Sequence, residues 1–143
     1  MESEGPIGIF DSGIGGLTVA SSISELLPNE QIIYFGDTQH LPYGNKSFKR
    51  IEEYCSKIVK FLLDKNCKAI VIACNSASAA AYLTINQQVQ KKALVFNVID
   101  PVIDYIKNTN RIKHVGVIGT NATIDSNVYT NKIKSFRNDV KVS

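Results

Sequence analysis

The chain contains 143 residues, of which 44% are hydrophobic and 20% are charged, and its formal net charge is +3. These proportions are typical of a globular domain, and no stretch approaches the ~20 apolar residues of a membrane-spanning helix. The basic residues of segment 105–143 are dispersed without interleaved aromatic residues, a pattern that argues against nucleic-acid binding.

Apolar runs alternate with amphipathic segments along the chain. In chain order, the pattern predicts a strand at 7–10, a helix at 16–27, a strand at 31–35, a long ordered loop at 36–46, a helix at 48–66, a strand at 69–73, a helix at 77–90, a strand at 94–98, a helix at 100–108, a strand at 114–118, a helix at 123–136 and the opening of a strand at 140–143. This alternation indicates an α/β fold with a parallel sheet covered by helices on both faces.

Local signals mark where some of these helices begin. Ser47 is expected to cap the helix at 48–66. Asp100 is expected to cap the helix at 100–108, with Pro101 at its first position. In the helix at 16–27 the apolar residues Leu17, Ala20, Ile23 and Leu27 share one face, which is expected to be buried.

Polar residues follow three of the predicted strands directly. These are Asp11-Ser12-Gly13, Cys74-Asn75-Ser76 and Gly119-Thr120. Because carboxyl ends of parallel strands meet at one edge of a sheet, they are expected to lie together where open α/β sheets bind ligands. Cys74 also precedes a helix, whose free N–H groups and positive dipole end favour a thiolate. The alternative is a cysteine packed in the core, as is common for this residue type.

The segment Asp11-Ser12-Gly13-Ile14-Gly15-Gly16 is open to two interpretations. A dinucleotide fingerprint would require glycine where the chain has Thr18, although Asp37 stands where a ribose-binding acid would lie. A carboxylate at this position instead suits an ammonium group, or accepts a proton from a thiol. The second interpretation is favoured, because Asp11 would repel a phosphate.

Further polar groups lie in the loop and before the last helix. Pro42-Tyr43-Gly44 offers backbone N–H groups and a phenol to a ligand carboxylate, or forms a plain turn with Tyr43 as a packed lid. Thr120 and Thr123 place hydroxyl groups at a helix start, where capping alone would explain both.

The remaining cysteines and histidines suggest neither a disulfide framework nor a metal site. Cys55 and Cys67 are expected to be packing residues, and His40 and His114 lie far apart in the sequence. The first residues carry acids and no apolar segment of a secretory signal, so a cytoplasmic location is expected.

Four segments, in this order, resemble the glutamate racemases of the aspartate/glutamate racemase superfamily. They are Asp11-Ser12-Gly13-Ile14-Gly15-Gly16-Leu17-Thr18-Val19, Gly36-Asp37-Thr38 with Pro42-Tyr43-Gly44, Ala73-Cys74-Asn75-Ser76-Ala77-Ser78-Ala79, and Gly119-Thr120-Asn121-Ala122-Thr123-Ile124. The resemblance implies a first α/β lobe at 1–97 and the beginning of a second lobe at 98–143. The family usually has threonine at the position of Ser76, and serine keeps the hydroxyl.

The resemblance also implies a cofactor-independent racemase that interconverts L- and D-glutamate for peptidoglycan synthesis. Two bases act on opposite faces of the substrate Cα, and Cys74 would be one of them. Asp11 would lie beside it and assist the thiol or the substrate ammonium. The substrate would be held by Ser12, Pro42, Tyr43, Gly44, Asn75, Ser76, Thr120 and Thr123.

The chain departs from this family in length. Members are about twice as long, and their second cysteine, in a segment like Gly-Cys-Thr-His-Tyr-Pro, has no counterpart here. An N-terminal fragment that does not racemise alone is therefore expected, with self-association or a separate C-terminal half as its partner. The alternatives are a silent amino-acid-binding module, half of a split assembly, or a cysteine hydrolase, which would need a histidine near Cys74; His114 is expected at the wrong end of the sheet.

Overall fold

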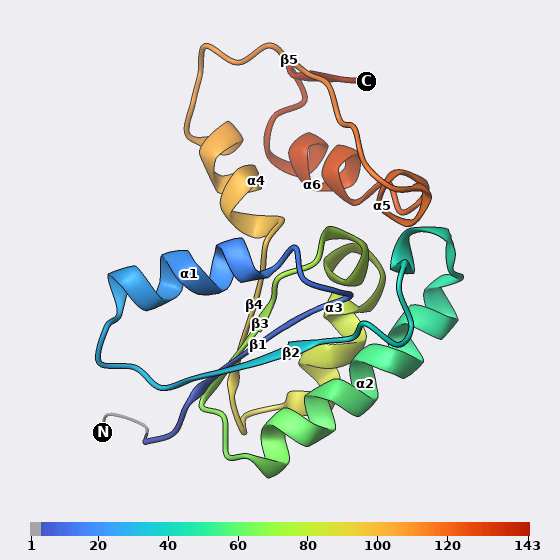
Figure 1. The fold of residues 1–143 in the computed structure, drawn as a ribbon. Helices are drawn as coiled ribbons and strands as arrows, with labels where there is room; N and C mark the ends of the chain where they lie inside the picture. Colours follow the sequence, from blue (N-terminus) through green and yellow to red (C-terminus); the bar gives the residue numbers. More distant parts are fainter. Residues whose placement is uncertain (1–3) are drawn as a thin grey trace.

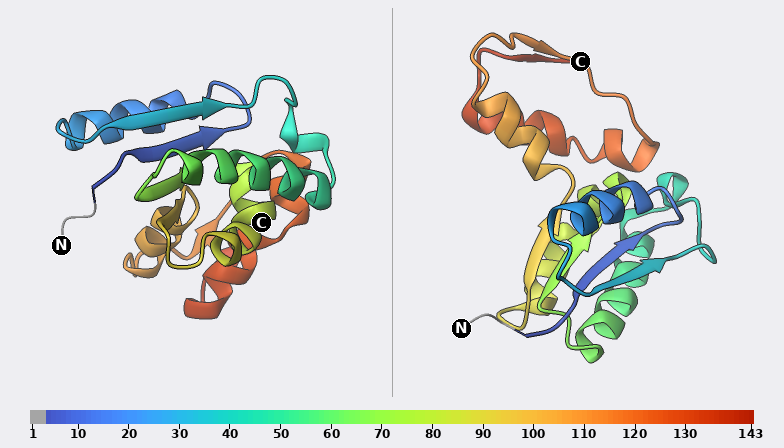
Figure 2. Two further views of the ribbon diagram at one scale, coloured as in Figure 1. Left: turned by 90° about the horizontal axis from the view of Figure 1, so that it is seen from below. Right: turned by 60° about the vertical axis from the view of Figure 1, so that its left-hand side comes forward.

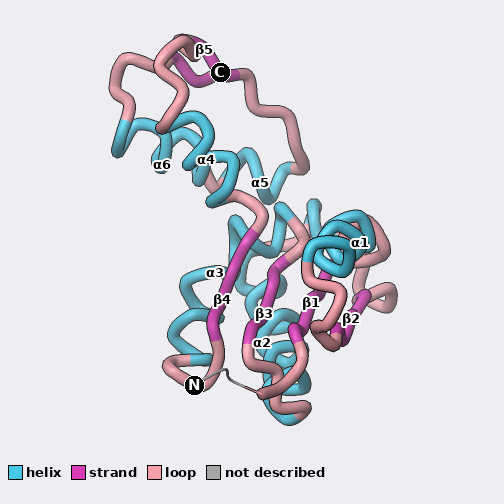
Figure 3. The backbone as a smooth tube through the Cα atoms, turned by 90° about the vertical axis from the view of Figure 1, so that its left-hand side faces the viewer, coloured by secondary structure: helices cyan, strands magenta, loops and turns pink. Residues whose placement is uncertain are grey.

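The computed structural model describes residues 4–143. Residues 1–3, which belong to the segment expected to carry no secretory signal, lie outside the described residues. Four parallel strands form the main sheet in the order β2-β1-β3-β4, and Figure 3 shows them side by side. They are β1 (Ile7–Asp11), β2 (Ile32–Gly36), β3 (Ala69–Ile72) and β4 (Leu94–Asn97). The predicted α/β class with a parallel sheet is confirmed. In register, Ile9 of β1 lies opposite Tyr34 of β2 and Val71 of β3.

Helices cover the two faces of this sheet unequally (Figure 1). Helix α1 (Leu17–Leu26) lies on one face, whereas α2 (Phe48–Asp64) and α3 (Asn75–Val89) lie on the other. The apolar stripe of α2 is buried at Ile51, Cys55, Ile58, Val59 and Leu62, whereas Phe48 at its start is 40% exposed. Ser47 caps α2 as predicted, since its hydroxyl accepts a hydrogen bond from the backbone N–H of Arg50.

Residues 98–143, which follow β4, are referred to as the second unit. It contains α4 (Asp100–Lys107), β5 (His114–Val115), α5 (Asn121–Asp125), α6 (Val128–Phe136) and β6 (Lys141–Val142), and β5 pairs with β6 in parallel. Its core consists of Ile99, Ile103, Ile106, Ile133 and Val140. The arrows of the main sheet point toward this unit in the right-hand view of Figure 2. The carboxyl ends of the strands therefore face the second unit.

Two predicted elements of the second unit are wrong in extent. The helix expected at 123–136 is two helices, because Asn127 adopts a left-handed conformation (φ 53°) and Ser126 Oγ accepts from the N–H of Val128. The strand expected at 114–118 is limited to two residues. Its partner β6 is equally short, and Ile118 is 98% exposed. A strand needs a neighbour to continue, and beyond Val115 the described residues provide one backbone bond, from the N–H of Val117 to Ser143 O at 2.7 Å.

Two helix starts also differ from the expectation. Helix α3 begins at Asn75 rather than Ala77, which makes Cys74 its N-cap. Asp100 is the first residue of α4 rather than its cap. The Asn97 side-chain oxygen accepts from the N–H groups of Ile99 and Asp100, at 2.9 and 3.0 Å. Two of the N–H groups that a helix start leaves without a helical partner are therefore hydrogen bonded by Asn97. The Asp100 carboxylate binds Asn97 Nδ2 and Lys132 Nζ instead.

The face of the sheet under α1 is incompletely covered. Leu17 and Leu27, which were expected on the buried face of α1, are 50% and 47% exposed. An apolar groove of about 310 Å³ runs beside α1 over the sheet, and it is lined by residues that include Ile7, Ile23, Val71, Phe96 and Pro101. Strand β4 is the open edge of the sheet beside it. A single helix of ten residues is too small to cover four strands.

Candidate active site

Two of the three polar segments predicted to meet, Asp11-Ser12-Gly13 and Cys74-Asn75-Ser76, lie at the carboxyl ends of the neighbouring strands β1 and β3. The third, Gly119-Thr120, comes after β5, which belongs to the separate two-stranded sheet. Asp11 ends β1, Asp37 follows β2, and Cys74 follows β3. The backbone N–H of Asp37 donates to Asp11 O at 2.9 Å, and that of Ala73 donates to Phe10 O at 2.8 Å, so these ends remain joined. The three side chains are therefore carried on a rigid edge rather than on separate loops.

Cys74 lies between a helix start and a hydroxyl group. Its Sγ accepts from the N–H of Ala77 at 3.4 Å and donates to Ser12 Oγ at 3.4 Å. The residue is 8% exposed and also packs against the main core. The sulfur nevertheless has two polar partners. Burial raises the pKa of both Cys55 and Cys67, as suits packing residues.

Asp11 is connected to Cys74 through Ser12. Its Oδ1 accepts from Ser12 Oγ at 3.4 Å, and its Oδ2 accepts from the N–H of Gly16 at 2.9 Å. A Cβ atom on Gly16 would stand 2.8 Å from the Cβ atoms of both Asp11 and Ala73, so only glycine allows this close approach. Asp11 is expected beside the thiol, and the hydrogen-bonded path between them runs from the carboxylate through the Ser12 hydroxyl to the sulfur.

Tyr34 is a member of this site that the sequence analysis missed. Its hydroxyl donates to Gly13 O at 3.4 Å, within the turn that follows β1. Burial raises its pKa, and the nearby Asp11 and Cys74 side chains raise it further. Tyr34 lies opposite Ile9 of β1 in the sheet. The alternation of side chains along β2 is the sequence signal that would have placed it on this face.

The loop after β2 is organised around the buried Asp37 carboxylate. Tyr43 donates its hydroxyl to Asp37 Oδ2 at 2.6 Å, and His40 Nδ1 lies 2.8 Å from Asp37 Oδ1. Burial and this hydrogen bond raise the pKa of Tyr43 well above its usual range. Tyr43 is 1% exposed, so its phenol anchors the loop. Pro42 is exposed at the start of the Tyr43–Asn45 turn.

Gly44 brings this loop against the second unit. A Cβ atom there would stand 2.5 Å from Thr120 Cβ. The loop and the segment at Thr120 therefore touch at the position where glycine has no side chain. Thr120 Oγ1 lies 2.8 Å from Ser76 Oγ and 3.2 Å from Thr123 Oγ1. It also caps α5 by accepting from the N–H of Thr123. Capping alone therefore does not account for Thr120, because its hydroxyl also joins Ser76 across the two units.

Asn75 lies on the exposed side of the same edge. Its Oδ1 accepts from the hydroxyl of Tyr129 at 2.7 Å. Both residues line a pocket of about 420 Å³ together with Thr120 and Thr123, and apolar residues of the second unit form the rest of its wall. The pocket is within the range of small-molecule sites. Asp11, Ser12 and Cys74 do not line it.

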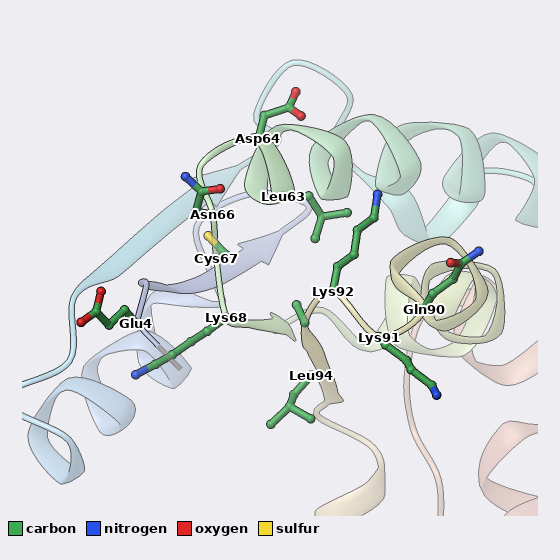
Figure 4. Close-up of a pocket in the computed structure, with 11 residues that line it drawn as sticks. Glu4, Leu63, Asp64, Asn66, Cys67, Lys68, Gln90, Lys91, Lys92 and Leu94 are labelled. Carbon is green, nitrogen blue, oxygen red and sulfur yellow. The ribbon is translucent and has the colours of Figure 1, made fainter. Parts of the chain in front are cut away.

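A larger pocket, of about 800 Å³, lies at the opposite end of the sheet. It is lined by residues at the start of β3 and β4 and holds none of the predicted site residues. Its basic side chains do not converge, since the amino groups of Lys68, Lys91 and Lys92 point in different directions (Figure 4). Lys68 is moreover paired with Glu30 at 2.6 Å. Size alone does not identify a ligand site here.

Within residues 4–143, no three or more His, Cys, Asp or Glu side chains are grouped so that they could hold a metal ion. None of the helices described has both the length and the apolar character needed to traverse a bilayer. The two histidines bind Asp37 and Ser143, and neither is hydrogen bonded to Cys74.

Comparison with known proteins gives a consistent result. The Asp/Glu/Hydantoin racemase family model matches residues 7–143. Glutamate racemase 3 of Caldanaerobacter subterraneus is 42% identical over 137 residues, which are 96% of this chain and 48% of that protein. Glutamate racemase of Neisseria meningitidis is 45% identical over 96% of this chain and 50% of its own length. The chain thus spans about half the length of the curated relatives it matches.

The fold agrees with solved structures of the same kind. The crystal structure of glutamate racemase from Francisella tularensis in complex with D-glutamate has a TM-score of 0.89 and 42% identity. That match covers 98% of this chain and 52% of the Francisella chain.

Proposed function

Because this chain belongs to the Asp/Glu/Hydantoin racemase family, we propose that it carries one half of the active site of a glutamate racemase. The reaction interconverts L- and D-glutamate without a cofactor. The observation that carries this proposal is the position of Cys74, whose sulfur is held between the N–H of Ala77 and the hydroxyl of Ser12. The similarity to a structure in complex with D-glutamate supports the choice of substrate.

The proposed chemistry needs a base on each face of the substrate Cα. One base removes the proton, and the conjugate acid of the other returns a proton from the opposite side, which inverts the centre. Cys74 is proposed as one base, because a donated N–H and a helix N-terminus stabilise negative charge on sulfur. The second base is proposed to come from the half of the relatives' length that this chain does not span.

The substrate groups are assigned by charge. The Asp11 carboxylate suits the ammonium group, and the polar groups around Thr120 suit carboxylates. These are Asn75, Ser76, Thr120 and Thr123, together with the Pro42-Tyr43-Gly44 backbone. Ser12, which contacts Asp11 and Cys74, is assigned to the bound substrate as well. Since the Tyr43 phenol is bound to Asp37, we assign it the role of fixing this loop. The boundary between the two lobes is proposed at residues 97 and 98, between β4 and α4.

The biological setting is part of the proposal. The product D-glutamate would serve peptidoglycan synthesis in the cytoplasm, with neither nucleic acid nor membrane as a partner. The hydrolase alternative loses its support, since neither histidine is hydrogen bonded to Cys74. Half of a split assembly remains a second candidate, favoured by the open apolar groove beside α1.

Glutamate titrated into ¹⁵N-labelled chain is expected to shift the amide signals of residues 11–13, 74–76 and 120–123. These segments meet at the carboxyl edge of the sheet, and glutarate, which lacks the ammonium group, serves as the control and is expected to shift residues 11–13 less. Shifts confined to the pocket around Lys68, Lys91 and Lys92 would contradict the proposed site.

The uncovered face beside α1 is proposed to mediate self-association of the chain. The apparent mass in light scattering is expected to rise with concentration, because Phe96 is 52% exposed on the open edge strand. Phe96→Lys is expected to lower this rise. Leu83→Lys is the matched control, since Leu83 is 74% exposed on α3, on the other face. A monodisperse monomer at high concentration would overturn the proposal.

A further inference from the structure

One hydrogen bond links the second unit to the residue that follows Cys74. Tyr129, near the start of α6, donates its hydroxyl to Oδ1 of Asn75, the first residue of α3, at 2.7 Å. The two residues are 54 positions apart in the sequence. Tyr129 stands in none of the motifs of the sequence, and the proposed function leaves it without a role.

Tyr129 is itself well fixed, so its hydroxyl can fix the orientation of the Asn75 side chain. Its ring packs against the core cluster of the second unit, which includes Ile99, Ile103 and Ile133. Burial also raises its pKa, so the hydroxyl keeps its proton and remains a donor. The start of α6 is fixed by Ser126 Oγ, which accepts from the N–H of Val128 at 3.2 Å. The donor is thus supported by both packing and backbone.

The break at Asn127 explains why Tyr129 and the threonines share one pocket. Thr120 and Thr123 belong to α5 and its cap, whereas Tyr129 belongs to α6, and the left-handed Asn127 separates the two helices. All three residues and Asn75 line the pocket of about 420 Å³. A continuous helix, as the periodicity predicted, would give the chain a different course between these residues.

The orientation of an asparagine side-chain amide is not fixed without such a hydrogen-bond partner. Rotation by half a turn exchanges its oxygen, which accepts hydrogen bonds, with its nitrogen, which donates two. Asn75 is exposed, and no other hydrogen bond of its side chain is found within residues 4–143. When Oδ1 is occupied by the Tyr129 hydroxyl, the amide presents Nδ2 to a ligand. A carboxylate is the group that such a donor binds best.

We propose that Tyr129 is a positioning residue, whose hydroxyl orients the Asn75 amide so that its NH₂ group donates to a carboxylate of the bound amino acid. This inference rests on the proposed function, since it assumes that glutamate binds beside Asn75. It adds a residue of the second unit to the substrate-binding arrangement. It also makes the orientation of Asn75 depend on how the two units are joined.

The test compares Tyr129→Phe with Tyr105→Phe in glutamate titrations of the ¹⁵N-labelled chain. Tyr105 is a matched control, because it is 59% exposed on α4 and its hydroxyl makes no hydrogen bond within residues 4–143. Loss of one hydrogen bond is expected to weaken glutamate binding about 5- to 10-fold in Tyr129→Phe. The glutamate-dependent shift of the Asn75 side-chain NH₂ signals is expected to shrink, while Tyr105→Phe behaves as wild type.

A double variant separates positioning from a merely structural role. In an Asn75→Ala background, Tyr129→Phe is expected to cause no further loss of affinity, because its effect acts through the amide. An equal loss in both backgrounds, or wild-type affinity in Tyr129→Phe, would overturn the positioning role alone. Absence of any glutamate response in the wild-type chain would instead overturn the proposed function, and the positioning role with it.

Discussion

Cys74→Ala is expected to abolish exchange of the glutamate Cα proton with solvent. A positioned general base contributes about 10²- to 10⁴-fold to the rate of proton transfer, and alanine leaves no group in its place. The measurement is the loss of the Cα signal of glutamate in D₂O, followed by proton NMR. Cys55 and Cys67 are buried in the core at 0% and 2% exposure and cannot substitute for it.

Cys67→Ala is the matched control for this variant. It removes a thiol at the opposite end of β3, and its exchange rate is expected to equal that of the wild type. The rate is compared only after the folded fraction of each variant has been measured by circular dichroism. Exchange that continues unchanged in Cys74→Ala would refute the role assigned to the sulfur.

Asp11→Asn is expected to slow the same exchange about 10- to 100-fold. The amide keeps the shape of the side chain but removes the negative charge that would attract the substrate ammonium, and a hydrogen bond to a charged group is worth about 1.5–3 kcal/mol. The Gly16 N–H and the Ser12 hydroxyl both donate to this carboxylate, so both contacts weaken. Asp104→Asn, at an exposed position on α4, is expected to leave the rate unchanged.

Ser12→Ala tests whether Asp11 also acts on the thiol. Because the path from Asp11 to Cys74 runs through Ser12 Oγ, the effects of Ser12→Ala and Asp11→Asn are expected to be less than additive in the double variant. Strict additivity of the two effects would show that Asp11 serves the substrate alone.

Elements with strong local signals could be predicted from the sequence. The apolar runs of β1 and β3 predict strands that are buried on both faces. The 3.6-residue period of α2 determines which face of the helix is buried, and Ser47 marks its start. The positions of Asp11 and Cys74 at the sheet edge follow from parallel strand topology. These predictions depend only on residues close in sequence and on the rule that the carboxyl ends of parallel strands lie at the same edge of a sheet.

Features that depend on contacts distant in sequence could not be predicted. The left-handed Asn127 lies within a helical period that continues on both sides. The extent of β5 depends on its partner β6, and the role of the Tyr43 hydroxyl depends on the burial of Asp37. The sequence pattern predicts the start of α3 two residues late, because Asn75 and Ser76 are weak helix formers, although Cys74 supplies the cap.

The stereochemistry of exchange by the unmodified chain tests the two-base proposal most directly. Each enantiomer of glutamate is incubated with the chain in D₂O, and deuterium at Cα and optical configuration are both measured. With one base at Cys74, we expect deuterium to enter a single enantiomer with retention of configuration, and neither enantiomer to be converted into the other. Accumulation of the opposite enantiomer with this chain alone would contradict the assignment of the second base to another segment.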